Sequence, residues 1–190
     1  MTRYALAGPH MVSQMAELFI RKFAAGDART IVAAFSAIGW SSKSASLFDR
    51  YLREQEEGRR DIFVAFVGAD FAGYVTVNWH PSYQPLAVEG IPEIQDLNVL
   101  PKFRRRGIAT RLVDQAEEVA GSRCKSVGIG VGLHPGYNAA QRMYVRRGYI
   151  PDGNGVTVRD EFVQEGQTIV IDDDIVLHLL KGLQSRARAG

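Results

Sequence analysis

The segment from Ile94 to Thr110 constrains the fold more than any other part of the chain, because a basic turn joins two elements of different type there. With Ile94, Leu97 and Val99 apolar, the residues over 93–100 predict a strand, which Pro101 ends. Apolar residues three and four apart then predict a helix over 107–120. A strand that runs directly into a helix is typical of an α/β domain, in which helices pack on a sheet.

The other segments also alternate between helical and extended patterns, and 190 residues suit one domain of ordinary size. We therefore expect a single α/β domain over 1–180 with a mixed sheet, followed by a C-terminal tail over 181–190. The remaining predicted elements are helices over 11–24, 28–38 and 44–57, a hairpin of strands over 61–67 and 71–79, a loop over 81–92, a strand over 126–133, a short helix capped by Asn138, a strand beginning near Tyr149 and a last strand over 168–180.

The turn before the predicted helix has the properties of an anion site. The first N–H groups of a helix have no partner within the helix and carry partial positive charge. Gly107 allows a ligand to approach the backbone, and Arg104, Arg105 and Arg106 add cationic donors. These features predict a bound pyrophosphate. A Walker loop is excluded, because Ile108 rather than Lys follows the glycine.

Three further glycines, Gly128, Gly130 and Gly132, are spaced by two within a predicted strand. This spacing and position do not fit the dinucleotide-binding fingerprint, which opens a helix. We expect these glycines to mark a close approach of neighbouring groups or a bulge.

Composition limits the partners of the protein. The chain has 23 basic and 21 acidic residues, a net charge of +2, so it lacks the global basic field expected of a nucleic-acid-binding protein. No apolar run approaches the ~20 residues of a membrane span, and the start of the chain shows no signal-peptide pattern. Cys124 is the single cysteine, which excludes an intrachain disulfide and a multi-cysteine zinc site. We expect a cytoplasmic protein with no metal, no membrane partner and no nucleic acid partner.

Two motifs together resemble a known family. Val99-x-Pro101 followed by Arg104-x-x-Gly107-x-Ala109 resembles the acyl-CoA-binding motif of the GNAT N-acetyltransferases. Downstream, the second family signature is matched by Asn138, Ala140, Tyr144, Gly148 and Tyr149. The resemblance covers about residues 4–180 and implies a mostly antiparallel central sheet, flanked by helices, whose central strands are splayed. Dimers are common in the family, so a homodimer remains open.

The resemblance also implies roles for individual residues with acetyl-CoA as co-substrate. The backbone of Leu97, Asn98 and Val99 would pair with pantetheine, and Asn138 would help to hold it. Tyr144 would lie near the sulfur and act as the general acid. The pyrophosphate would be held by the turn formed by Arg104, Arg105, Arg106, Gly107, Ile108, Ala109 and Thr110.

Three carboxylates are candidates for the general base. A lysine-like amine is rarely neutral near pH 7.4, so a base must remove its proton. The resemblance favours Glu93, with Asp96 as the second candidate and Glu89 as the third. Because Glu93 and Asp96 are three residues apart, a regular strand would place them on opposite faces. A backbone N–H near Val99 could stabilise the oxyanion.

The predicted function is acetyl transfer from acetyl-CoA to a primary amine, most simply of a small molecule. The alternatives are a protein or peptide acceptor, a non-catalytic acyl-CoA sensor and, on the arginines alone, a nucleic-acid-binding module.

Trp40, Trp79 and Tyr83 could line an acceptor pocket, although core packing is at least as good an explanation for Trp79. Seven acidic residues between positions 152 and 174 could attract a cationic acceptor, although a solvated hairpin is the commoner explanation. A surface or core role is favoured over a catalytic one for His134.

Overall fold

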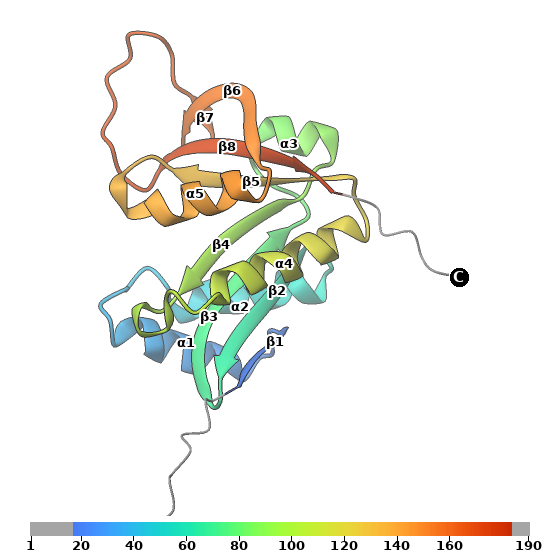
Figure 1. Ribbon diagram of the computed structural model, residues 1–190, viewed down its shortest axis with the longest axis vertical. Helices are drawn as coiled ribbons and strands as arrows, with labels where there is room; N and C mark the ends of the chain where they lie inside the picture. The colour runs from blue at the N-terminus through green and yellow to red at the C-terminus, as the bar shows by residue number, and fades with distance from the viewer. Residues whose placement is uncertain (1–16, 184–190) are drawn as a thin grey trace, which may run out of the picture.

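One eight-stranded sheet with the strand order β1-β2-β3-β4-β5-β8-β6-β7 organises the protein (Figure 1). The computed structural model describes residues 17–183. The strands are β1 (Leu18–Lys22), β2 (Arg60–Val67), β3 (Asp70–Asn78), β4 (Glu93–Val99), β5 (Ser126–Gly132), β6 (Ile150–Val158), β7 (Glu161–Phe162) and β8 (Ile175–Gly182). The helices are α1 (Asp27–Ser36), α2 (Ala45–Glu56), α3 (Gln84–Glu89), α4 (Ile108–Gly121) and α5 (Asn138–Arg146), with short 3-10 turns η1 (Pro101–Phe103) and η2 (Pro135–Tyr137).

Helices cover both sides of the half of the sheet formed by β1–β4. Tyr74 of β3 is fully buried and makes edge-to-face contacts with Phe35 of α1 and Phe48 of α2, at ring-centroid distances of 5.9 and 5.5 Å. The apolar stripe of α4 is buried against β2–β5. In Figure 1, α4 crosses in front of these strands and α2 lies behind them. Burial of both apolar helix faces stabilises this half of the molecule.

The two central strands, β4 and β5, separate soon after they meet. They are the parallel neighbours in the sheet, and their pairing consists of Glu93 with Gly128 and Ile94 with Ile129, although each strand has seven residues. Beyond these pairs the strands diverge, as Figure 1 shows. The mixed sheet that the order of elements predicts is therefore confirmed, as is the mostly antiparallel sheet with splayed central strands that the family resemblance implies.

An irregularity in β4 changes which way its side chains point. Asp96 has a φ of +55°, and the pairing with β3 shifts there, so that Thr76 opposes Gln95 and Tyr74 opposes Asn98. The extra residue breaks the alternation of faces along the strand. The expectation that Glu93 and Asp96 face opposite sides is wrong for this reason, because the Asp96 carboxylate reaches the Tyr74 side of the sheet.

Two predicted elements differ from the structure because tertiary contacts outweigh local pattern. The expected helix over 11–24 is wrong from Leu18 onward: this segment is strand β1, paired antiparallel with β2, and Phe19 stacks on Phe66. Residues 11–16 lie outside the described part of the chain. The expected loop over 81–92 contains helix α3, which tolerates Pro85 in its first turn and ends at Gly90 in a left-handed conformation.

Smaller corrections concern element ends. The last strand begins at Ile175 rather than 168, and it continues to Gly182, two residues into the segment assigned to the tail. Residues 184–190 of that tail lie outside the described part. Asn138 does not cap α5 with its side chain, because the 3-10 turn η2 precedes the helix and Tyr137 occupies the cap position.

The glycines of β5 allow the close approaches expected from their spacing. A Cβ on Gly128 would overlap the Leu86 side chain of α3, and one on Gly132 would overlap the ring of Tyr137. At Gly130 the added atom would overlap the Val176 side chain at 2.8 Å, and Glu93 Oε1 and His178 Nε2 would be its next neighbours at 3.4 and 3.7 Å. The absence of side chains at these three glycines therefore allows groups from other elements to lie close to the strand.

Candidate active site

The predicted anion site forms where β4 passes through η1 into α4. Gly107 precedes the helix with a φ of +75°, and Arg105 has a φ of +61°. Within the described chain no side chain caps the first turn of α4, so its N–H groups are available to a ligand. The Nε of exposed Arg104 donates to the carbonyl of Val99 at 3.2 Å, which ties the arginine turn to the end of β4.

Beyond the point where β4 and β5 separate, one edge of the β4 backbone has no neighbouring strand among the described residues. From Gln95 to Val99, β4 pairs with β3 on one side and has no strand partner on its β5 side within residues 17–183. The amide of Asn98 donates to the carbonyl oxygen of Asp96 at 3.0 Å, which holds the irregular turn of the strand. An extended ligand can therefore add to this edge as a further strand would.

Tyr144 lies on α5, which follows β5 and is tied to it because Gln141 Nε2 donates to the Gly132 carbonyl at 2.9 Å. The Tyr144 side chain is buried, its ring lies 5.8 Å from that of Tyr149, and its hydroxyl has no hydrogen-bond partner among the described residues. Burial raises the pKa of Tyr144, so the hydroxyl keeps its proton at neutral pH. Asn138 is exposed at the start of the same helix.

Glu93 lies where β4 and β5 meet, with 5% of its surface exposed. Its Oε2 accepts a hydrogen bond from Gln95 Nε2 at 2.7 Å, and its Oε1 is 3.7 Å from Nε2 of His178. Burial raises the pKa of Glu93 to about 7 because the charged form loses solvation, although Gln95 acts in the opposite direction. A carboxyl group with this pKa can take up a proton and release it near neutral pH.

Gln95 is held in turn by a buried arginine. Arg60 of β2 donates to Gln95 Oε1 at 3.0 Å and to the Thr76 hydroxyl at 2.8 Å, and its Nε pairs with Glu54 of α2 at 2.5 Å. Each of these contacts comes from a different element. The orientation of Glu93 is therefore fixed by the packing of β2, β3 and α2 on β4.

Asp96 has a contrasting environment. Its carboxylate pairs with Lys43 Nζ at 2.5 Å and accepts from the hydroxyls of Tyr51 and Tyr74, each at 2.8 Å. Burial acts to raise the pKa of Asp96, but Lys43 and the two hydroxyls outweigh it and hold that pKa below its usual range. A carboxylate with three donors is a poor proton acceptor, which argues against Asp96 as the base. Glu89, the third candidate, is exposed at the end of α3.

The aromatic residues and the histidine that the sequence analysis considered for the site lie in separate parts of the structure. Tyr83 is fully buried and stacks on His178, next to Glu93. Trp40 stacks on Phe35, and the Nε1 of Trp79 donates to Asp61 at 3.0 Å, so both pack on the β1–β4 half. His134 is half-buried and bonds to Asp173 at 2.7 Å.

Sequence reasoning missed several residues of the site, namely Lys43, Tyr51, Arg60 and His178. They come from the loop before α2, from α2, from β2 and from β8, all distant in sequence from β4, so no local spacing connects them with it. The signal that could have drawn attention to His178 is a lone histidine inside an apolar strand.

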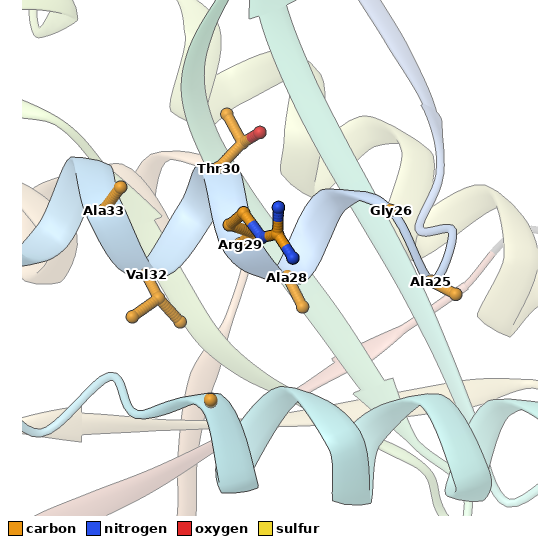
Figure 2. A pocket seen from close by; sticks show the side chains of 8 residues that line it. Ala25, Gly26, Ala28, Arg29, Thr30, Val32 and Ala33 are labelled. Carbon is orange, nitrogen blue, oxygen red and sulfur yellow. The ribbon is translucent and has the colours of Figure 1, made fainter.

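An open groove between α1 and α2 is separate from the candidate active site. Figure 2 shows its lining, and its volume is about 690 Å³. It is lined by Ala25, Gly26, Ala28, Arg29, Thr30, Val32, Ala33 and Ala45. These side chains are mostly small and apolar, and none of them belongs to the predicted site.

A sheet split between its parallel central strands, with a basic helix N-terminus beside the split, defines the class of acyl-CoA-dependent acyltransferases that share this fold. The chain belongs to the GNAT acetyltransferase family, since the family model described as "Acetyltransferase (GNAT) family" matches residues 25–149. It is accordingly an acyl-CoA-dependent N-acetyltransferase.

Solved structures share the fold at low sequence identity. An N-acetyltransferase from Staphylococcus aureus superposes with a TM-score of 0.67 at 16% identity, over 88% of this chain and 99% of that chain. Spermidine N-acetyltransferase from Vibrio cholerae, in complex with CoA and spermine, gives a TM-score of 0.59 at 17% identity, over 87% and 95%. The protein yncA from Salmonella typhimurium, with its cofactor acetyl-CoA, gives 0.62 at 17%, over 91% and 98%. No curated protein is significantly similar to this chain in sequence.

No helix within residues 17–183 is long and apolar enough to cross a membrane.

Proposed function

We propose that this enzyme transfers the acetyl group of acetyl-CoA to the primary amine of a small molecule, with Glu93 as general base and Tyr144 as general acid. The observation that carries the proposal is the buried Glu93 carboxyl at the junction of β4 and β5, whose pKa is raised to about 7. A base with this pKa is suited to removing the proton of an amine at neutral pH.

The residues around the split fit acetyl-CoA. The uncapped first turn of α4 and the exposed arginines beside it suit a pyrophosphate, and the unpaired edge of β4 suits an amide-bearing pantetheine arm. When bound, the thioester supplies an activated acetyl group. We propose that the co-substrate is held by Leu97, Asn98, Val99, Arg104, Arg105, Arg106, Gly107, Ile108, Ala109, Thr110 and Asn138.

In the proposed reaction, Glu93 takes the proton of the amine, directly or through water, and the neutral amine attacks the thioester carbonyl. A backbone N–H near Val99 stabilises the negative charge that develops on that oxygen. As the carbon–sulfur bond breaks, Tyr144, whose hydroxyl keeps its proton because of burial, donates it to the departing thiolate, and the second proton of the amine nitrogen passes to the Tyr144 oxygen, directly or through water, as the amide forms. Asp152 and Asp160 place negative charge beside His178, which favours a cationic acceptor. The structure from Vibrio cholerae that contains spermine has the same fold.

The test is to mix the purified chain with acetyl-CoA and a panel of amines, and to measure release of free CoA thiol above the background without amine. The panel contains polyamines, aminoglycosides, amino acids and short peptides. Turnover on small amines supports the proposal, and turnover on peptides alone replaces it with a protein acceptor. Binding of acetyl-CoA without turnover on any amine would favour a sensor.

A Tyr144→Phe variant checks the acid. Since the change removes one hydroxyl from a buried ring, we expect kcat to fall about tenfold or more while the Kd for CoA by calorimetry stays the same. Equal kcat values for the variant and the parent would remove Tyr144 from the mechanism.

A further inference from the structure

Beside Glu93 lies a second buried titratable group, His178, to which the proposed reaction gives no task. His178 is on β8, directly opposite Gly130 of β5, and 2% of its surface is exposed. Its Nε2 lies 3.7 Å from Oε1 of Glu93. Gly130 lies beside this pair: a Cβ there would be in ordinary van der Waals contact with that Oε1 at 3.4 Å and that Nε2 at 3.7 Å, and it would overlap Val176 Cγ1 at 2.8 Å.

The orientation of the imidazole is fixed by its neighbours. The ring of His178 stacks on the ring of Tyr83 with centroids 3.6 Å apart and planes 3° from parallel. The Tyr83 hydroxyl in turn donates to Asp152 at 2.6 Å, so the stacking partner is itself anchored. The Nδ1 of His178 is buried without a hydrogen-bond partner in the described chain, which leaves Nε2 as the ring nitrogen that faces a partner.

The charged groups around the pair leave Glu93 as the group that titrates near neutral pH. Burial raises the pKa of Glu93 to about 7, with Asp160 adding to the rise and Arg60 opposing it. Burial lowers the pKa of His178, although Asp160 and Asp152 act to raise it. At neutral pH the imidazole is therefore uncharged, while the carboxyl is close to its midpoint.

We propose that His178 is a positioning residue for Glu93, whose neutral Nε2–H is directed at the ionised carboxylate and so sets the pH above which Glu93 can accept a proton from the amine. This inference rests on the proposed role of Glu93 as the base. When Glu93 takes the proton, its carboxyl becomes neutral and the contact with Nε2–H weakens, while the imidazole keeps its own proton. His178 thus stabilises the reactive form of the base without exchanging a proton with the acceptor.

The first test observes the pair directly and needs no acceptor. In the full chain labelled with ¹⁵N-histidine, the ring nitrogens of His178 are followed by NMR as a function of pH, and they are assigned by their loss in His178→Phe. We expect a step near pH 7 as Glu93 titrates, and we expect this step to vanish in Glu93→Gln, which preserves size. Identical titrations of His178 in the parent and in Glu93→Gln would overturn the proposal.

The second test is the pH profile of kcat/KM with the best amine from the panel. His178→Phe keeps a ring to stack on Tyr83 but removes the N–H. Loss of this donor disfavours the carboxylate, so we expect the ascending limb to move up by about one pH unit. This corresponds to about tenfold lower kcat/KM at pH 6, with values converging above pH 8.

Two further variants complete this test. His178→Gln retains an N–H donor, so the ascending limb of its kcat/KM profile should lie close to the pH of the parent. His80→Phe, at an exposed position after β3, should give the same profile as the parent. A loss for His178→Phe that is uniform across pH would show a merely structural role and overturn the proposal. If Glu93→Gln kept full turnover, the proposed base would be wrong, and the NMR titration would still decide whether His178 and Glu93 are coupled.

Discussion

Glu93 and Asp96 lie on the same strand, but their pKa values shift in opposite directions because their hydrogen-bond partners differ. Glu93 is buried with one amide donor, so its pKa is raised to about 7. Asp96 is bound by an ammonium and two hydroxyls, so its charged form is favoured. The irregular backbone of β4 allows both side chains to reach the same side of the sheet. Their environments thus separate a candidate base from a structural anion.

Glu93→Gln should lower kcat by about 100-fold to 10⁴-fold, because it removes the proposed proton acceptor without changing the packing. In the parent enzyme, kcat/KM should rise tenfold per pH unit below about pH 7 and level off above it, since the base must be ionised. Thiol release across pH measures both effects. The control is Glu89→Gln at the exposed end of α3, and an equal loss in this control would contradict the assignment.

Asp96→Asn should destabilise the fold by about 2 kcal/mol, because charged hydrogen bonds to Lys43, Tyr51 and Tyr74 are lost. The folded-state pKa of Asp96 is lowered, so its stabilising effect is present above the unfolded value of about 4 and is lost as pH falls through the folded value. Chemical unfolding at pH 7 and pH 3 measures this difference.

The control for Asp96→Asn is Asp70→Asn, which breaks an exposed pair with Lys102 and should change stability by less than about 1 kcal/mol. Equal effects of the two substitutions would show that Asp96 contributes no more than a surface ion pair.

At the scale of the elements, the turn into α4 combines a backbone requirement with a binding requirement. Gly107 has a φ of +75°, and a Cβ there would meet no atom within 4 Å, so any effect of a larger residue comes from backbone strain. The same backbone presents the N–H groups to which we assign the pyrophosphate. In the proposed mode of binding, stability and co-substrate affinity are therefore linked at this residue.

Gly107→Ala should cost about 1–2 kcal/mol of stability and weaken CoA binding, since an L residue is strained in the left-handed region. The matched control is Gly26→Ala before α1, where φ is −66° and the space is equally open. This change should be neutral or slightly stabilising. Unfolding midpoints and calorimetric titration with CoA measure both effects, and similar results for the two variants would contradict the argument.

The elements around this turn could be predicted from sequence because their signals are local. The strand over 93–100, the helix over 107–120 and the hairpin of β2 and β3 follow from period and turn residues, and the structure reproduces them within one or two residues. Strand β1 could not be predicted, because its pairing with β2 is a tertiary contact. The bulge at Asp96 is also set by the partner strand, so the facing of Glu93 and Asp96 could not be deduced from spacing. His178 comes close to Glu93 only through the order of strands in the sheet.

At the scale of the whole molecule, the sheet consists of two parts that are joined through two residue pairs at the base of β4 and β5. β1–β4 with α1, α2 and α4 form one part, and β5–β8 with α5 form the other (Figure 1). The proposed base lies at the junction, and the proposed acid lies on the second part.

This division has a consequence for the order in which substrates bind. If the pantetheine arm completes the open edge of β4, the surface that meets the amine is finished only after acetyl-CoA is in place. We therefore expect a compulsory sequence of addition, with acetyl-CoA first and CoA leaving last. Product inhibition would show it: CoA should compete with acetyl-CoA but not with the amine. Parallel double-reciprocal lines would instead indicate a covalent acetyl-enzyme and contradict direct transfer.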